Sequence, residues 1–218
     1  MRGKQVIDTV LFDLDGTLVD TNELIIDTVD YVFKTHLKQH QLEREDYIKF
    51  IGPTLRESFL NYAKSEAEVD FLIKAYKEKN LELHDDYVKA FEGASLLLSE
   101  LKKEGYQLAI VSSKMNHMVR RGLAVTNLIS FFDVIIGSDD VIKHKPDKEP
   151  ILKALSFFKE VKNAIYVGDH PNDIMAAKNA NIMSCGMNYS LHKEALLKAN
   201  ADVYIDSLIQ LKEVLQHV

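Results

Sequence analysis

Asp13 and Asp15 are the first residues in this sequence whose types and spacing could do chemistry. They follow the apolar residues 10–12, which predict a buried strand because a buried parallel strand is almost continuously hydrophobic. Side chains alternate along a strand, so both carboxylates leave it on the same side. Gly16 then allows a sharp turn before Thr17. We therefore expect a pair of carboxylates at the carboxyl end of a central strand, where open α/β sheets bind ligands.

Two structural explanations compete with a chemical role for these aspartates. A calcium-binding loop beginning at Asp13 would need glycine at its sixth position and glutamate at its twelfth, but Leu18 and Leu24 stand there. A helix cap would explain one aspartate, whereas two carboxylates on one face repel each other. The calcium loop is therefore excluded, and a catalytic or metal-binding role is favoured over a cap.

A second acidic pair, Asp169 and Asp173, follows another apolar run that ends at Gly168. A helix start favours acidic residues, which explains Asp173 alone, but Asp169 precedes both Pro171 and the expected helix. Carboxylates four residues apart share a helix face and repel by about 0.2–0.5 kcal/mol. A divalent cation explains both residues better, and Mg²⁺ binds one or two carboxylates together with waters and phosphate oxygens.

Ser112 and Lys145 are weaker candidates when each is taken alone. Ser112 follows the apolar residues 108–111, and a hydroxyl beside backbone amides at a turn suits a phosphoryl oxygen. Serine at a strand end is, however, more often a turn or cap residue. Lys145 precedes Pro146 in a loop, where the ordinary alternative is a solvated surface lysine. The eight histidines show no metal-ligand spacing, and we expect His84 at the surface.

Composition places the chain among ordinary globular proteins. Of its 218 residues, 46% are hydrophobic and 28% are charged, and the net charge of −6 argues against nucleic acid as a partner. Cys185 is the only cysteine, which excludes an internal disulfide and fits a reducing compartment. Acidic residues interrupt the apolar run that follows the basic residues 1–5, so we expect no signal peptide. No apolar stretch reaches membrane-spanning length, and we expect a cytoplasmic protein without a membrane partner.

The pattern along the chain predicts an α/β fold with an inserted helical block. Residues 21–85 show helical spacing without a clear strand, and Thr54 and Ser65 are candidate N-caps. From Gly93 onward, helices alternate with strands expected at residues 107–111, 134–136, 164–167, 182–185 and 203–205. Such alternation predicts βαβ units and a parallel sheet. We therefore expect a core formed by residues 1–19 and 86–218, and an all-helical cap formed by residues 20–85 that acts as a lid.

The four motifs together resemble the haloacid dehalogenase-like hydrolase superfamily. They are Asp13-x-Asp15-Gly16-Thr17, Ser112, Lys145-Pro146 and Gly168-Asp169-x-x-x-Asp173, in this order along the chain. The resemblance extends over the whole chain, including the helical insert after the first motif. It implies a Rossmann-like three-layer core with a parallel sheet, and Mg²⁺-dependent phosphoryl transfer through an aspartyl-phosphate.

The same resemblance implies a role for each motif residue. Asp13 would be the nucleophile and Asp15 the general acid and base. Ser112 and Lys145 would hold the phosphoryl group, with Gly16 and Thr17 among the phosphate-binding residues. The Mg²⁺ ligands would be Asp13, the backbone carbonyl of Asp15, and Asp169, while Asp173 would be a ligand or lie just behind the ligands.

Two stretches of the helical block narrow the resemblance, residues 20–26 and 50–55. With residues 131–135 and 139–141, they resemble pyrophosphatases of the PpaX type, which are related to phosphoglycolate phosphatases. This implies inorganic pyrophosphate as the small phosphorylated substrate. We expect Gly52, Pro53 and Thr54 to face the active site, although a plain turn between helices is an equal alternative.

Four other functions stay open at this point. A phosphoglycolate phosphatase or another small phosphomonoester phosphatase would carry the same core motifs, because the lid decides the substrate. A phosphomutase would also carry them, and a product assay with sugar phosphates would distinguish it. A phosphate-receiver domain would be shorter and lack the insert. A non-catalytic interaction protein is disfavoured because every motif residue is intact.

Overall fold

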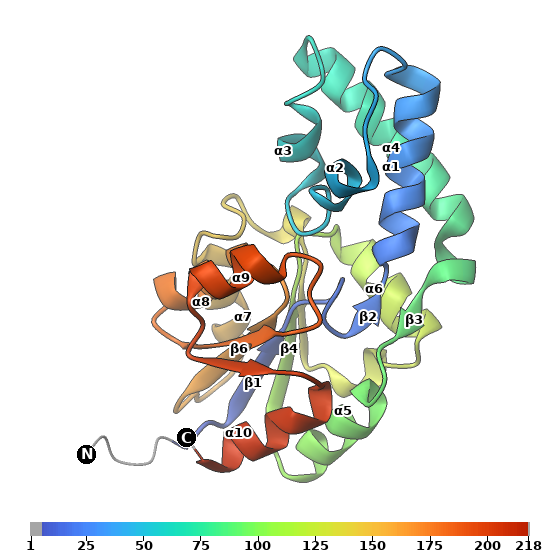
Figure 1. The fold of residues 1–218 in the computed structure, drawn as a ribbon. Coiled ribbons are helices and arrows are strands. Elements are labelled where there is room, and N and C mark those ends of the chain that lie inside the picture. The colour runs from blue at the N-terminus through green and yellow to red at the C-terminus, as the bar shows by residue number, and fades with distance from the viewer. Residues whose placement is uncertain (1–5, 218) are drawn as a thin grey trace.

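The computed structural model describes residues 6–217, and a six-stranded parallel sheet forms its centre (Figure 1). The basic residues 1–5 of the sequence analysis lie outside this described part. The strand order is β5-β4-β1-β6-β7-β8, so the strand that precedes Asp13 lies in the middle of the sheet. The strands are β1 (Thr9–Phe12), β4 (Gln107–Val111), β5 (Val134–Ile136), β6 (Ala164–Gly168), β7 (Met183–Met187) and β8 (Val203–Ile205). The predicted α/β fold with a parallel sheet is confirmed.

Helices cover both faces of this sheet and make the three layers. The side chains of β1 show why, because Val10 and Phe12 belong to one hydrophobic cluster and Leu11 belongs to the other. The helices of the core are α5 (Ala94–Lys103), α6 (Asn116–Val125), α7 (Glu149–Leu155), α8 (Pro171–Asn179), α9 (Lys193–Ala199) and α10 (Leu211–His217). The first cluster includes residues of α5, α6 and α10, and the second includes residues of α7 and α8.

Four helices between β1 and α5 have a hydrophobic cluster of their own. We call them the helical segment: α1 (Asn22–His36), α2 (Arg44–Ile48), α3 (Leu55–Phe59) and α4 (Glu66–Tyr87). Phe33 lies inside this cluster, with the rings of Phe50, Phe59 and Tyr62 around it. In Figure 1 the segment stands above the carboxyl-end edge of the sheet. Helix α4 continues to Tyr87, beyond residue 85 where we expected the helical block to end.

The caps expected at the start of α3 and α4 are present. The side chain of Thr54 accepts a hydrogen bond from the backbone N–H of Glu57, and the side chain of Ser65 accepts one from the N–H of Glu68. These bonds satisfy backbone donors that the first turn of a helix leaves without partners. The predicted N-caps are therefore confirmed.

A short antiparallel pair that the sequence analysis did not predict connects the helical segment with the sheet. Strand β2 (Val19–Asp20) pairs with β3 (Lys89–Ala90), so the chain enters and leaves the segment side by side. Strands of two residues are too short to show a period in the sequence. The pairing places both crossings at one edge of the segment, as Figure 1 shows.

The expectation that His84 lies at the surface is wrong. Its side chain is fully buried near the end of α4, where α4 packs against α6. The imidazole faces Gly122 of α6, since a Cβ added there would lie at an ordinary contact distance of 3.9 Å from Nε2 of His84. The packing of α4 against α6 buries the imidazole, which is a tertiary effect that residue type alone does not reveal.

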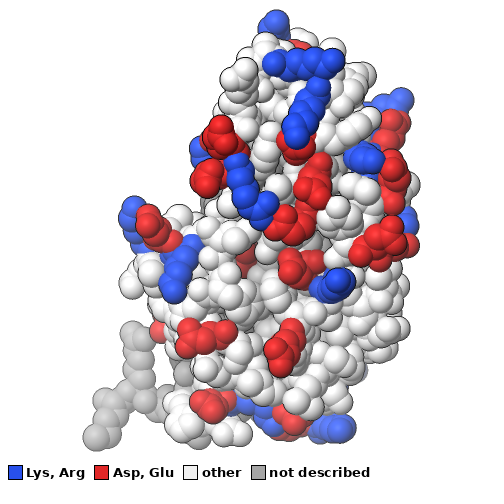
Figure 2. All heavy atoms as spheres, turned by 45° about the vertical axis from the view of Figure 1, so that its right-hand side comes forward, with Lys and Arg blue, Asp and Glu red and all other residues white. Residues whose placement is uncertain are grey.

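The surface carries both signs of charge. On the face shown in Figure 2, Lys and Arg are interspersed with Asp and Glu over the helical segment and over the sheet layers below it. Among residues 6–217, no helix combines the length and the apolar character needed to span a membrane.

Candidate active site

Asp13 stands at the point where the central strand meets its two neighbours. Its backbone N–H still donates to the carbonyl of Val167 in β6, at 2.9 Å, which fixes the chain just beyond β1. Its side chain is 5% exposed and accepts a hydrogen bond from Nζ of Lys145, also at 2.9 Å. Burial raises the pKa of Asp13 to about 7, with a further increase from Asp173, although Lys145 opposes the shift.

Lys145 is a buried member of this site, so the alternative of a solvated surface lysine is wrong. Its ammonium group is surrounded by three close acceptors, at 2.6 Å to Asp173 Oδ1, 2.9 Å to Asp13 Oδ1 and 3.0 Å to the hydroxyl of Tyr166. These match the three protons of an ammonium group. Burial lowers the pKa of Lys145, but the two carboxylates outweigh burial and raise the pKa well above its ordinary value.

Asp13, Asp169 and Asp173 form a buried cluster in which one carboxylate oxygen from each lies within 4.8 Å of the others. Asp169 and Asp173 are 3% and 1% exposed. Burial raises the pKa of Asp169 well above its ordinary value, and the negative charges of Asp173 and Asp13 raise it further. Three carboxylates beside one ammonium leave two negative charges in a desolvated site. One divalent cation would neutralise them, so the side chains present fit such an ion.

Two residues that we expected to bind phosphate are in contact with Asp169. The hydroxyl of Thr17 donates to Oδ1 of Asp169 at 3.2 Å, and both groups are buried. Gly16 has a φ of +78°, and a Cβ there would overlap the Asp169 carboxylate. The contacts in this structure therefore position Asp169, and a phosphate contact through Gly16 or Thr17 stays a prediction.

Both oxygens of Asp173 are already hydrogen-bonded. Lys145 donates to Oδ1, and the backbone N–H of His170 donates to Oδ2 at 2.9 Å, at the start of α8. The latter bond is half of a capping arrangement in which Asn172 N–H donates to the ring of His170. Asp173 thus connects the beginning of α8 with the buried lysine.

Asp15 faces the helical segment instead of the buried cluster. Its Oδ1 accepts from the hydroxyl of Thr21 at 2.7 Å and from Nζ of Lys114 at 2.9 Å. Both partners leave Asp15 partly exposed, at the boundary between the sheet and the cavity above it. The two aspartates of the first motif therefore occupy different environments, one buried against Lys145 and one open to the cavity.

Ser112 lies beside these carboxylates, at the end of β4. Its backbone N–H donates to the carbonyl of Ile136 in β5, which extends the strand pairing to the last residue before the turn. Its Oγ accepts from the backbone N–H of Lys114 at 3.2 Å, so the hydroxyl proton stays available for an oxygen in the cavity. Sheet geometry thus brings Ser112 and Asp13 to the same edge.

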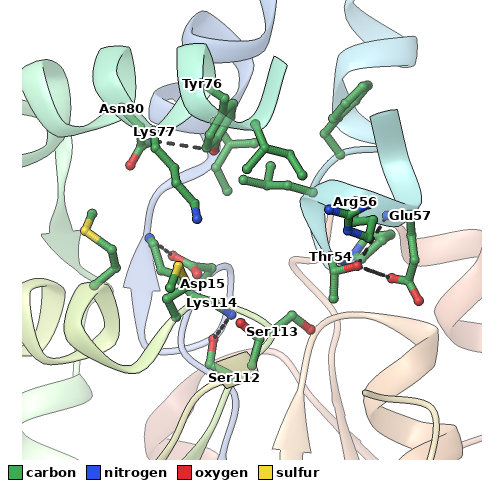
Figure 3. Close-up of a pocket in the computed structure, with 18 of the residues that line it drawn as sticks. Asp15, Thr54, Arg56, Glu57, Tyr76, Lys77, Asn80, Ser112, Ser113 and Lys114 are labelled. Atoms are coloured by element: carbon green, nitrogen blue, oxygen red, sulfur yellow. Dashed lines mark hydrogen bonds and ion pairs between the residues drawn. The ribbon is translucent and has the colours of Figure 1, made fainter. Parts of the chain in front are cut away.

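A cavity of about 580 Å³ lies between this edge of the sheet and the helical segment (Figure 3). Asp13, Asp15 and Ser112 line its floor. Loops of the core around residues 113–118, 138–139 and 144 line its side, and the helical segment contributes the upper walls: Ile25, Phe50, Gly52, Pro53, Thr54, Leu55, Arg56, Glu57, Leu60, Ile73, Tyr76, Lys77, Asn80 and Leu81. The loop formed by Gly52, Pro53 and Thr54 therefore lines the same cavity as the two aspartates of the first motif.

Gly52 also contacts the sheet layers directly. Its φ is +106°, and a Cβ at this position would lie 2.5 Å from the ring of His170. The His170 ring in turn packs edge-on against His192, with 4.7 Å between ring centroids. Burial lowers the pKa of His170 to about 4, which keeps the imidazole neutral against the glycine.

Three residues of the site were missed by the sequence analysis. Lys114 follows Ser112 closely enough to be suspected, because strand-end residues gather at one edge. Tyr166 lies within β6, and its hydroxyl donates to the carbonyl of Val111 at 2.6 Å while accepting from Lys145. A tyrosine inside an apolar strand signals a buried polar partner. His170 gives no such signal, since its contact with Gly52 depends on where the helical segment lies.

The site has the features of a hydrolase that transfers phosphoryl groups: a carboxylate nucleophile candidate, a buried cation and an acidic cluster suited to a metal ion. The family model of haloacid dehalogenase-like hydrolases matches residues 10–187. The chain belongs to this family, as the resemblance of its motifs indicated.

Relatives of known name agree with this assignment. The chain is 40% identical over 218 residues to the pyrophosphatase PpaX of Listeria monocytogenes, an alignment that covers 99% of both chains. It is 38% identical over 214 residues to the pyrophosphatase PpaX of Bacillus cereus, covering 97% of this chain and 98% of the relative. A haloacid dehalogenase-like hydrolase structure from Streptococcus pneumoniae superimposes with a TM-score of 0.84 at 26% identity, covering 96% and 98% of the two chains.

Proposed function

We propose that this enzyme hydrolyses inorganic pyrophosphate with Mg²⁺ as cofactor, through an aspartyl-phosphate intermediate. The observation that carries the choice of substrate is the similarity to PpaX pyrophosphatases, at 38–40% identity over nearly the whole chain. Because the match extends through the helical segment, it includes the residues that line the upper part of the cavity. Those residues, more than the shared core, decide which substrate is accepted.

Asp13, Asp169 and the backbone carbonyl of Asp15 are the proposed ligands of the metal ion. Bound Mg²⁺ would supply positive charge next to the transferring phosphoryl group. Asp173 is instead proposed as a positioning residue, because Lys145 and the N–H of His170 already occupy its two oxygens. Its function would be to hold Lys145 against Asp13.

Asp13 acts as the nucleophile in the proposed reaction. One of its carboxylate oxygens bonds to a phosphorus atom of pyrophosphate while the bond from that phosphorus to the bridging oxygen breaks. The Lys145 ammonium, 2.9 Å from the Asp13 carboxylate, favours its ionised form against the effect of burial. Splitting hydrolysis into two displacements replaces one difficult step by two easier ones.

Asp15 is the proposed general acid and base. It protonates the bridging oxygen as the first phosphate leaves, and it then removes a proton from the water that attacks the acyl-phosphate phosphorus. The second step releases phosphate and restores the Asp13 carboxylate. Thr21 and Lys114 hold the Asp15 side chain toward the cavity, and a positioned general acid and base contributes about 10²–10⁴-fold to rate.

Lys145 and Ser112 are the proposed contacts of the phosphoryl oxygens. Charge spreads over these oxygens in the transition state, so fixed donors and cations lower the barrier without having to rearrange. Lys145 is fixed by three acceptors, and Ser112 keeps its hydroxyl proton free. The helical segment would act as the lid that covers this site.

A cytoplasmic location is proposed as well. It is supported by the single cysteine, Cys185, which is free and buried, because proteins of a reducing compartment rarely contain disulfides.

A small organic phosphomonoester, such as phosphoglycolate, is the second candidate substrate. The cavity of about 580 Å³ has room for more than pyrophosphate, and apolar side chains such as Ile25, Phe50 and Leu55 line part of it. A phosphomutase would use the same core residues but would return a phosphorylated sugar instead of phosphate.

The test is a Mg²⁺-dependent kinetic panel that compares kcat/KM for pyrophosphate, phosphoglycolate, nucleotides and sugar phosphates. The proposal predicts the highest value for pyrophosphate, loss of activity with a chelator, and no turnover by Asp13→Asn. A strong preference for phosphoglycolate would overturn the substrate and leave the mechanism in place. Conversion of one sugar phosphate into another would identify a phosphomutase.

A further inference from the structure

Helix α4 presents one lysine to the cavity whose surroundings differ from those of its neighbours. Lys74 pairs with Glu78 at 3.9 Å, and Lys79 pairs with Glu82 at 2.8 Å, both at ordinary helical spacing. The residues three and four positions from Lys77 are Ile73, Lys74, Asn80 and Leu81, none of which is acidic. Lys77 therefore has no carboxylate to pair with along its own helix face.

The other strong cations around the cavity are already paired. Arg56 forms ion pairs with Glu66 and Asp70. Lys114 pairs with Asp15 on the floor of the cavity. Among the Lys and Arg side chains of residues 6–217 that line this cavity, Lys77 is the one without a carboxylate within ion-pair distance.

The side chain of Lys77 points into the cavity. Figure 3 shows it extending from α4 toward the side of the floor occupied by Asp15 and Lys114. The adjacent face of α4 is fixed, since Tyr76 and Asn80 are buried and the Asn80 amide donates to the Tyr76 hydroxyl at 3.4 Å. An unpaired ammonium on a rigid helix thus faces the proposed proton donor from above.

We propose that Lys77 is a specificity-determining residue that binds the leaving phosphoryl group of pyrophosphate. The inference rests on the proposed function and adds a contact from the helical segment. When one phosphoryl group is at Asp13, the bridging oxygen must face Asp15, which places the second phosphoryl group farther into the cavity. Lys77 reaches this region from above. A charged hydrogen bond there favours a leaving group that has phosphoryl oxygens over one that has none.

The test compares two substrates, of which only one has a second phosphoryl group in its leaving group. Pyrophosphate releases phosphate, whereas the para-nitrophenol released from para-nitrophenyl phosphate has no phosphoryl oxygens for Lys77 to bind. In Lys77→Met we expect kcat/KM for pyrophosphate to fall about 10- to 100-fold, the effect of losing one charged hydrogen bond. The value for para-nitrophenyl phosphate should stay within about twofold of wild type, and Lys77→Arg should recover part of the loss on pyrophosphate.

Lys74→Met is the matched control, because it removes the same charge from the same helix at a position outside the cavity lining. This variant should leave kcat/KM unchanged for both substrates. Equal losses on both substrates in Lys77→Met, or an unchanged kcat/KM for pyrophosphate, would overturn the role of Lys77.

Failure of the proposed function would look different from failure of this inference. If the wild-type enzyme prefers phosphoglycolate, pyrophosphate is not its substrate, and the role of Lys77 in binding a leaving phosphoryl group falls with it. If the wild-type enzyme prefers pyrophosphate but Lys77→Met changes nothing, the function stands and the Lys77 contact alone is refuted.

Discussion

The floor and the upper walls of the cavity are built on opposite principles. At and beneath the floor, Asp13 and its partners Lys145 and Asp173 are almost fully buried and hold one another through short hydrogen bonds. On the upper walls, Arg56 and Lys77 are exposed, and much of the remaining lining is apolar. This buried group is held in place and desolvated, which suits chemistry that is the same for every substrate. The walls belong to the helical segment, which has a hydrophobic cluster of its own, and this suits selection among substrates.

Burial explains why Asp13, Lys145 and Asp173 need so many hydrogen-bond partners. Removing one member of a buried ion pair lowers the free energy of unfolding by about 3–5 kcal/mol, because the remaining charge is buried without a partner or solvent. Exposed pairs such as those of Arg56 contribute about 0–1 kcal/mol. Substitutions on the floor should therefore impair every substrate and alter stability, whereas substitutions on the walls should act on some substrates and leave stability nearly unchanged.

The largest effect is expected for Asp13→Asn, which removes the proposed nucleophile. We expect kcat to fall by at least about 10⁴-fold on every substrate, because the covalent step cannot occur. Asp15→Asn should lose about 10²–10⁴-fold and should still be phosphorylated slowly. Steady-state rates and acid-quench assays on both variants check this order. Wild-type rates for Asp13→Asn on any substrate would contradict the assignment of the nucleophile.

A smaller effect is expected for Gly16→Ala. The new Cβ would overlap the Asp169 carboxylate and displace it from the acidic cluster. We expect Mg²⁺ affinity to fall about 10- to 100-fold, as for other changes that disturb the orientation of a metal ligand. The Mg²⁺ dependence of kcat measures it.

Gly105→Ala is the control for Gly16→Ala. Its φ of +88° imposes a similar backbone strain, but a Cβ there meets nothing within 4 Å. If both variants lose the same Mg²⁺ affinity, strain alone is responsible and the contact with Asp169 is irrelevant.

The pH dependence of the free energy of unfolding tests the burial of Asp13. The pKa of Asp13 rises from 3.8 to about 7 on folding, so the folded metal-free protein holds a proton that the unfolded chain has released. Its contribution to stability is therefore present at low pH and is lost as pH rises from about 4 to about 7. His170, whose pKa is lowered to about 4, acts in the opposite direction between about 4 and 6.5.

Comparing wild type with Asp13→Asn removes the histidine contribution, because both proteins contain it. With a chelator present, the difference in the free energy of unfolding should move in favour of the variant by up to about 1.4 kcal/mol per pH unit over this range. Urea denaturation at pH 5, 6, 7 and 8 measures it. Parallel curves for the two proteins would show that Asp13 is not desolvated as described.

The smallest effect is expected for Gly52→Ala, at the point where the walls meet the floor. The added Cβ would press on the ring of His170 and push the loop away from the sheet layers. We expect KM to rise by less than about tenfold, with kcat nearly unchanged, since uniform binding is lost and the chemical groups are untouched. Gly93→Ala has a comparable φ of +81° without any neighbour within 4 Å and should leave KM unchanged.

The strands and the N-caps were predictable because their signals are local. Apolar runs marked the strands, and the hydroxyls of Thr54 and Ser65 marked helix starts. The acidic motifs could also be assigned, because parallel strands bring their carboxyl ends to one edge of the sheet.

Other features could not be predicted because they depend on packing between distant segments. His84 is buried because α4 packs against α6, and His170 meets Gly52 only once the helical segment is in place. Tyr166 reaches Lys145 across the end of the sheet. In each case the partner is far away in the sequence, and no periodicity connects the two residues.

The location of the phosphoryl group during turnover tests directly whether Asp13 is the nucleophile. The enzyme would be mixed with pyrophosphate and Mg²⁺, quenched, and reduced with borohydride, which converts an aspartyl-phosphate into homoserine. Trypsin would then release residues 5–34, which contain both Asp13 and Asp15, for sequencing by mass spectrometry. If Asp13 is the nucleophile, homoserine is expected at position 13 and Asp15 stays unmodified. Homoserine at position 15, or no reduced residue in an enzyme trapped at full turnover, would contradict it.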